Sequence, residues 1–528
     1  MKVVGRVGAL RMCAALAAVV LAMTGLVSRP VAAQVGGPED CPEVRPIAEI
    51  ERGLTGTGYT VSQGTEPEPF DVEVLGVLEN GVAPGRDMIV VDTSGPAIDA
   101  AGGIWFGMSG SPVYDDDGAL LGAVAFGLTW GPSSIGGLTP AADLVELLDY
   151  PLGQAPVAAT SVALSGGLER RVNAREGGGS DDVSLRRLRA PLSVSGLTER
   201  GRETLAKAIR KEGNNYLVTQ GSSATAAEPG AELGTVGAGD TFAAALSYGD
   251  ITIGGIGTTS LVCDGQSVAF GHPFGWEGKT ELGANAGDTH TIVDDPLFGP
   301  YKLASITEPV GIVDQDRLAG IRALLGTAPE LRPVTSTVTA TDIGRTQDGA
   351  SQAVTDDIVP ILGFYHLFGN IDSTFDTIGE GNSRVAWTVT GTTEEGEPWS
   401  LSRSNLYSSR WDISIESSIE VLNQLGTLVD NKFTEIDFTG VDLDATVEEE
   451  RSGYRIGKVR HSNNNRNFKG GRHVKVRRGS TLFLRIALKD IEGDDDLSVD
   501  MKMKMPRDFR RGYLLVSGGN RGGGFFCF

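Results

Sequence analysis

The sequence has 528 residues and a net charge of −22, which argues against nucleic acid as a partner because phosphate binding needs a basic surface. Four cysteines and five histidines, without a CxxC pair or a Cys/His cluster, argue against a zinc site, and no cofactor or metal is predicted. The 73 glycines and 6% aromatic residues favour a turn-rich, mainly β protein of several domains.

The first 33 residues have the three parts of a signal peptide. A basic start is followed by an apolar stretch at 12–27, and Val31-Ala32-Ala33 provides the small residues for cleavage before Gln34. The apolar run is about sixteen residues long, shorter than the roughly 20 that a spanning helix needs. We therefore expect a secreted or extracytoplasmic protein that has no membrane span after cleavage.

Three cysteines remain after this cleavage, namely Cys41, Cys263 and Cys527. An odd number allows at most one disulfide within the chain and leaves one thiol free. A bridge between Cys41 and Cys263 is one candidate, but the sequence does not fix which pair forms.

Residues 47–150 are predicted to form a first β-rich segment. The alternation of apolar and polar residues at 70–78 is typical of a half-buried strand. Two apolar runs, 112–114 and 119–126, flank an Asp-Asp-Asp-Gly sequence, which predicts a hairpin with an Asp-Gly turn. The hexapeptide Gly107-Met108-Ser109-Gly110-Ser111-Pro112 leads directly into this hairpin.

This hexapeptide has the residue types that a nucleophilic serine needs. A tight turn between Gly107 and Gly110 presents the Ser109 hydroxyl and allows a carbonyl substrate to approach closely. The N–H groups of Gly107 and Ser109 are candidates for an oxyanion hole, in which each donor typically contributes about 10²–10³ in rate. An ordinary turn between strands is the alternative, because Gly, Ser and Pro are common turn residues.

The rest of the chain divides into three further parts. Residues 151–190 are predicted as a linker because 177–182 is rich in Gly, Ser and charge. Residues 191–326 are predicted as a second structured segment, which contains strands and a Gly/Pro loop around His272. Residues 330–528 are β-rich again and are predicted to form a C-terminal β-sandwich-like domain.

A serine nucleophile needs a base, and histidine is the usual one. No histidine precedes Ser109, so the base must lie downstream, where His272 stands out at the end of an apolar strand in Ala269-Phe270-Gly271-His272-Pro273-Phe274. A structural role for this histidine in its loop is the alternative. The third member of a triad is left open, as is a dyad whose histidine is oriented by a backbone carbonyl. The carboxylates considered are Asp288, Asp294 and Asp295 after the histidine, and Asp92 and Asp99 near the serine.

A strong charge contrast lies in the C-terminal part. The segment from Arg451 to Arg478 is rich in Lys and Arg without an acidic residue, and it directly follows the acidic stretch 437–450. One interpretation is a docking face for an anionic cell-envelope polymer or partner. The other is a pair of oppositely charged strands or loops that solvate the surface or pair with each other.

Residues 107–131 resemble the nucleophile region of trypsin-like peptidases, in which a Gly-x-Ser-Gly-x-Pro turn precedes a hairpin and an apolar strand. They resemble more closely the SpoIVB-type serine peptidases, named for sporulation stage IV protein B, in which Gly-Met-Ser-Gly-Ser-Pro recurs. The similarity continues at Gly122-Ala123-Val124, at the Gly-Leu-Thr-Pro of 137–140 and upstream at Gly56-Thr57-Gly58-Tyr59, so it covers about 53–148.

The resemblance implies a trypsin-like double β-barrel, with Ser109 as the nucleophile. It also implies that His272 is the catalytic histidine, because the family presents this residue in a similar apolar-Gly-His loop. That loop precedes the serine in the sporulation enzymes and follows it here, a swapped order that triad geometry tolerates.

The activity implied is that of a secreted serine endopeptidase on protein or peptide substrates. The apolar strand 123–127, which would line the specificity pocket, favours a small or hydrophobic residue before the cut. The alternative is a catalytically inactive exported binding or envelope-scaffold protein of the same fold.

Overall fold

The computed structural model describes residues 41–516 with short gaps. The expected signal peptide at 1–33 and Cys527 lie outside the described residues. The gaps are 130, 150–160, 165, 177–182, 212–215, 229, 435, 492, 494–495 and 509. None of the helices in the described part combines the length and apolar character that crossing a membrane requires.

The first sheet has eight strands in the order β4-β1-β2-β3-β6-β5-β8-β7. Because β4 also pairs with β5, six of the strands form a closed ring, β4-β1-β2-β3-β6-β5. The strands are β1 (Thr55–Thr60), β2 (Glu68–Ala83), β3 (Arg86–Ser94), β4 (Pro112–Asp115), β5 (Leu120–Leu128), β6 (Ile135–Pro140), β7 (Ser161–Ala163) and β8 (Ser184–Arg187). The short helices α1 (Pro96–Ala101) and α2 (Ala141–Glu146) belong to the same segment. In β2, Phe70, Val72 and Val74 are buried and alternate with more exposed residues, as the sequence predicted.

The segment predicted as a linker, 151–190, differs from that expectation wherever it is described. It contains β7, β8 and the helix α3 (Gly166–Glu176), and β8 extends the first sheet by pairing with β5. Leu168 and Val172, one helical turn apart, are buried together with Leu185 of β8. A few well-spaced apolar residues are enough to attach this charged segment to the core. The prediction of a linker was based on the overall content of Gly, Ser and charged residues, which does not reveal these few positions.

The second sheet begins with another ring of strands. Here β11 and β12 pair with each other at the ends of the series β12-β13-β16-β15-β14-β11, so six strands close a barrel. Its strands are β11 (Thr241–Gly249), β12 (Ile253–Cys263), β13 (Gln266–Ala269), β14 (Gly278–Val293), β15 (Tyr301–Arg317) and β16 (Gly320–Leu325). β9 (Ala190–Val194) and β10 (Tyr216–Gln220) extend the sheet beside β12, and α4 (Glu199–Lys211) connects these two strands.

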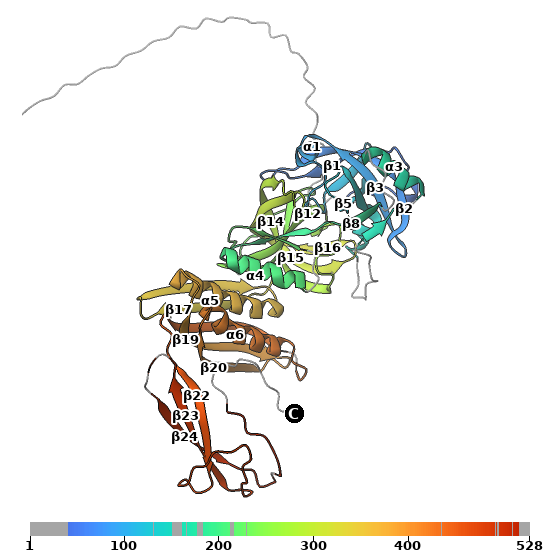
Figure 1. Ribbon diagram of the computed structural model, residues 1–528. Helices are drawn as coiled ribbons and strands as arrows, with labels where there is room; N and C mark the ends of the chain where they lie inside the picture. The colour runs from blue at the N-terminus through green and yellow to red at the C-terminus, as the bar shows by residue number, and fades with distance from the viewer. Residues whose placement is uncertain are drawn as a thin grey trace, which may run out of the picture. The chain divides into compact units, whose positions relative to one another are not determined.

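The C-terminal part continues this second sheet. β18 pairs with β11 of the barrel, and the order runs on as β18-β17-β21-β19-β20. The bounds are β17 (Arg332–Ala340), β18 (Arg345–Ala353), β19 (Gly381–Thr393), β20 (Pro398–Ser409) and β21 (Ile436–Glu448). Two helices, α5 (Val359–Phe375) and α6 (Ile413–Val429), pack on each other and on these strands (Figure 1).

The prediction of a C-terminal β-sandwich-like domain is therefore not confirmed. In a sandwich, a second sheet would cover the apolar face of the first. Here α5 and α6 do so, and nearly every side chain of α5 is buried. The Thr/Val alternation of β17 correctly indicates a strand, but it does not reveal what packs on that strand.

The basic segment 451–478 includes β22, the first strand of a separate three-stranded sheet, β22-β23-β24, and most of the loop between β22 and β23. Its strands are β22 (Tyr454–Ser462), β23 (Thr481–Asp490) and β24 (Leu497–Lys504). The acidic stretch lies mainly in β21, whose strand partners are β17 and β19, whereas basic β22 pairs with β23. The two charged stretches are thus not paired as neighbouring strands, and the envelope contact stays a prediction.

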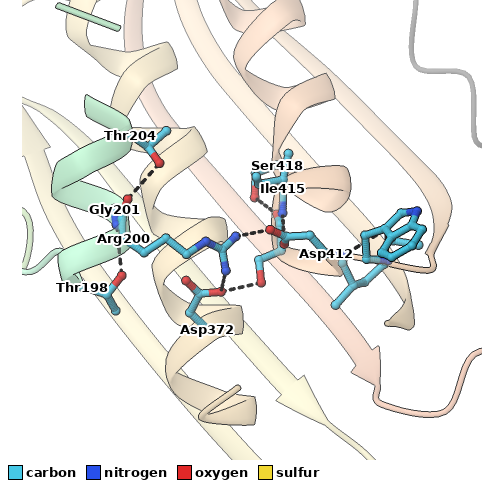
Figure 2. Close-up of polar contacts among 12 residues, drawn as sticks. Thr198, Arg200, Gly201, Thr204, Asp372, Asp412, Ile415 and Ser418 are labelled. Atoms are coloured by element: carbon cyan, nitrogen blue, oxygen red, sulfur yellow. Dashed lines mark hydrogen bonds and ion pairs between the residues drawn. The ribbon is translucent and has the colours of Figure 1, made fainter. Parts of the chain in front are cut away.

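Arg200 of α4 connects the second segment to the helices of the C-terminal part (Figure 2). Its guanidinium donates to Asp372 at 3.0 Å, pairs with Asp412, and lies 4.4 Å from the centre of the Phe368 ring. Asp412 is also the N-cap of α6, where its carboxylate accepts from the Ile415 N–H at 3.1 Å. One side chain therefore fixes the end of α5 and the start of α6.

A disulfide joins Cys41 to Cys263 at the end of β12, with 4.5 Å between their Cα atoms. Of the cysteine pairings that the sequence left open, this is the one that forms. It ties the residues before β1 to the second sheet across 222 positions of sequence.

We expect Arg200→Ala to lower the local stability of α6 by about 1–2 kcal/mol, because two partly buried carboxylates lose their cation. Hydrogen exchange of the first turn of α6 measures this loss. Lys207→Ala, on the exposed side of the same helix, should leave that exchange unchanged. Equal exchange in both variants would contradict the role given to Arg200.

We expect replacement of both Cys41 and Cys263 by Ser to destabilise the fold by about 4–5 kcal/mol, because the closed loop is long. Thermal melting with and without reductant checks this. Reductant should lower the melting temperature of the wild-type protein to that of the double variant, and should leave the variant unaffected.

Candidate active site

Ser109 lies in a turn between α1 and β4, and this turn packs against the second sheet. The Ser109 side chain is fully buried, and its Oγ has no hydrogen-bond partner among the described residues. Thr258 of β12 holds the turn by two hydrogen bonds, from its N–H to the Ser109 carbonyl at 2.8 Å and from its hydroxyl to the Gly107 carbonyl at 3.1 Å. The serine is therefore anchored through its backbone, and its hydroxyl is left unpaired.

The hydrogen bonds of the turn leave two N–H groups unused. The carbonyls of 106 to 109 all accept hydrogen bonds, from Lys302, Thr258 and Ser111. The N–H groups of 106, 108, 110 and 111 all donate to backbone carbonyls. The Gly107 and Ser109 N–H groups donate to no described residue, and they are the pair predicted as the oxyanion hole.

Both glycines of the turn are required by backbone conformation and by space. Gly107 and Gly110 have φ of 91° and 97°, in the region that favours glycine. A Cβ at 110 would lie 1.9 Å from the Thr258 carbonyl oxygen, and one at 107 would lie 2.8 Å from the Cβ of Lys302. The turn could not approach β12 and β15 so closely with any other residue at these positions.

His272 lies in a strained, buried loop after β13. Phe270 has φ of 72°, unfavourable for a bulky side chain, and its ring packs against those of Phe242, Phe274 and His272. Asp316 of β15 holds the following residues, because its carboxylate accepts from the N–H groups of Phe274, Gly275 and Trp276 at 2.5–2.8 Å. Burial raises the pKa of Asp316 to about 6, although these donors oppose the shift.

The His272 imidazole has a defined tautomer. Its Nδ1 lies 2.8 Å from the Pro273 carbonyl oxygen, which can only accept, so Nδ1 carries the proton and Nε2 has the lone pair. The side chain is 2% exposed, and Nε2 has no partner among the described residues. Burial, helped by the nearby Arg187, lowers the pKa of His272 to about 3, so the ring is neutral at physiological pH.

Ser109 and His272 are not hydrogen-bonded in this structure, because Ser109 Oγ and His272 Nε2 both lack a partner. Their segments nevertheless meet. Gly110 donates to the Val124 carbonyl at 2.7 Å, and a Cβ on Gly271 would lie 3.0 Å from that same oxygen. The fold thus brings the segments of the two predicted residues together in one buried region, without a hydrogen bond between the two side chains.

The carboxylates considered for a third position do not orient His272, whose Nδ1 is bound to the Pro273 carbonyl. Asp92 accepts from Ser134 and Arg175, and Asp295 caps the N–H groups of 297 and 298. Asp294 lines a pocket that is described next, Asp288 lies on β14, and Asp99 lies in α1. Sequence reasoning did not single out Asp316 or Thr258, which hold the two loops of the site.

A pocket of about 270 Å³ begins beside the turn at Phe106, the residue before Gly107. Gly127 and Leu128 of β5 form part of its wall, together with Leu188, so of the strand 123–127 predicted to line a specificity pocket only Gly127 lies here. Arg186 and the loop 294–300 complete it, so the lining is partly charged.

The mainly β fold with a closed six-stranded barrel, and the serine turn beside two N–H groups without a described acceptor, are consistent with the class of serine-peptidase-like proteins. The family model described as SpoIVB peptidase S55 matches residues 39–137, and the sequence-based prediction of this family is confirmed. The match includes the whole hexapeptide and ends before His272. No curated protein and no solved structure matches the chain.

We expect Asp316→Asn to loosen the His272 loop, because the amide keeps one acceptor oxygen and adds donors that face three N–H groups. The free energy of unfolding should fall by about 2 kcal/mol, and the amides of 274–276 should exchange at least tenfold faster. Hydrogen exchange followed by mass spectrometry measures this. Asp288→Asn is the matched control, because the Asp288 carboxylate on β14 has no hydrogen bond or ion pair with a described residue.

Proposed function

We propose that this protein is an exported SpoIVB-type serine endopeptidase that hydrolyses peptide bonds in protein substrates. One observation carries the proposal. In the turn 106–111, which lies within the segment that matches the family, the N–H groups of Gly107 and Ser109 donate to no described residue, and the Ser109 hydroxyl is unpaired. The two rings of six strands are consistent with a trypsin-like double barrel, and we include that architecture in the proposal.

The chemistry follows from these groups. Ser109 Oγ would attack the scissile carbonyl carbon as its proton leaves, and the carbonyl oxygen would become an oxyanion bound by the 107 and 109 N–H groups. Collapse would release the amine and leave an acyl-enzyme, which water would then hydrolyse. The family resemblance assigns the proton transfer to His272, and the Nδ1–H tautomer, oriented by the Pro273 carbonyl, is the one such a role requires.

Turnover requires movement, because Ser109 and His272 are both buried as the chain stands. The Phe106 pocket begins beside the serine turn, and a substrate side chain could lie in it. The part of its wall that β5 forms supports a preference for a small or hydrophobic substrate residue before the scissile bond. Arg186 in the same wall could pair with an acidic group of the substrate.

A second candidate is an inactive exported binding or envelope-scaffold protein of the same fold. The lack of a hydrogen bond between Ser109 and His272 favours this alternative. It predicts a folded protein whose serine never reacts.

We expect a fluorophosphonate probe to label the mature protein at Ser109, because the probe reports a serine that an adjacent base and an oxyanion hole have activated. Mass spectrometry of the labelled peptide checks the site. Ser109→Ala should remove the label, whereas Ser111→Ala, two positions away, should retain it. A well-folded wild-type protein without label would support the inactive alternative.

A further inference from the structure

Lys302 of β15 is a fully buried lysine directly behind the serine turn. The backbone N–H of Lys302 donates to the Phe106 carbonyl at 2.8 Å. The Cβ of Lys302 lies so close to Gly107 that a Cβ at position 107 would clash with it. Nothing in the fold alone requires a cation here, because the neighbouring inward positions of β15 hold Ala304 and Ile306. A buried lysine beside a candidate nucleophile calls for a chemical explanation.

The hydrogen bonds of Lys302 connect it to the turn. Its Nζ donates to the Thr241 and Thr258 hydroxyl oxygens, both at 3.3 Å. Thr258 is the residue that holds the Gly107 and Ser109 carbonyls, and its hydroxyl hydrogen points to Gly107. Lys302 must therefore be the donor to Thr258, because the one hydroxyl hydrogen is already used.

Counting hydrogens favours an uncharged amine. A neutral amine has two N–H groups, which match its two acceptors, and keeps one free lone pair. An ammonium would bury a third N–H without an acceptor and a charge without a described ion-pair partner. Burial lowers the pKa of Lys302 to about 7, while the carboxylate of Asp240 before β11 acts in the opposite direction.

Thr258 connects two buried groups: its hydroxyl accepts from Lys302 Nζ, and its N–H donates to the carbonyl of Ser109, whose own hydroxyl is unpaired. They are not hydrogen-bonded here, but catalytic hydrogen bonds often form only when substrate binds. We infer that Lys302 is the base that accepts the Ser109 proton, a role that the family resemblance alone would give to His272. This inference rests on the proposed peptidase function.

The proton balance of such a step is complete. As the Oγ–C bond forms, the Ser109 proton moves to Lys302 Nζ, and the carbonyl electron pair moves to the oxyanion. When the C–N bond breaks, the resulting ammonium gives that proton to the leaving amine. In deacylation, water gives a proton to Lys302, which returns it to Ser109 Oγ. The neutral His272, with a pKa far below neutral pH, is the weaker base of the two.

The test compares the rate of fluorophosphonate labelling of Ser109 from pH 5 to 9 in the full mature chain. The wild-type rate should rise with pH around a midpoint near 7, as Lys302 loses its proton. Lys302→Met, similar in shape but unable to accept a proton, should label at least tenfold more slowly. Lys207→Met, an exposed lysine of α4, should behave as wild type.

A second variant, His272→Gln, tests His272 as the alternative base. This test does not require that Lys302→Met folds. The labelling profile of His272→Gln should keep the step near pH 7, because Lys302 and not His272 sets that step. Loss of that step in folded His272→Gln, or Lys302→Met labelling within tenfold of wild type, would overturn the inference while the peptidase function stands. Absence of label from folded wild-type protein would instead overturn the proposed function, and the role of Lys302 with it.

Discussion

The contact between the serine turn and Thr258 determines the geometry of the whole site. Two hydrogen bonds from this residue hold the carbonyls of Gly107 and Ser109, so the turn lies against β12 at a distance that only glycine allows. With these carbonyls and their neighbours satisfied, the two N–H groups that remain are those an oxyanion would need. A closely packed contact between the first sheet and the second thus produces a feature that neither sheet has alone.

The same close contact explains why the site is closed. Ser109, His272 and Lys302 are all buried, and Ser109 Oγ and His272 Nε2 have no hydrogen-bond partner among the described residues. Such unsatisfied groups usually cost stability, so their concentration around one turn is typical of a functional site rather than of a core. The strained backbone at Phe270 lies in the same region.

The sequence allowed the family and the hairpin after Ser109 to be predicted, because these depend on residues close together in the chain. The assignment of the Gly107 and Ser109 N–H groups to an oxyanion hole stays a prediction. Thr258, Asp316 and Lys302 reach the site through long-range strand pairing, which a single sequence does not reveal. Lys302 left one local signal, a lysine at an inward position of a strand that also buries Ala304 and Ile306. The helices α5 and α6 were missed because strand alternation before them does not show what covers a sheet.

The pairing of β18 with β11 also determines where the chain can be truncated without exposing part of the barrel. β18 lies beyond the predicted boundary near 326–330, yet it covers the edge of the barrel at Ser247–Gly249, and the Ala350 N–H donates to Asp250. A fragment that stops at that boundary would expose an open strand edge, a surface prone to adding strands from other molecules and to aggregation. We therefore expect the C-terminal part to keep this edge of the barrel from pairing with other molecules.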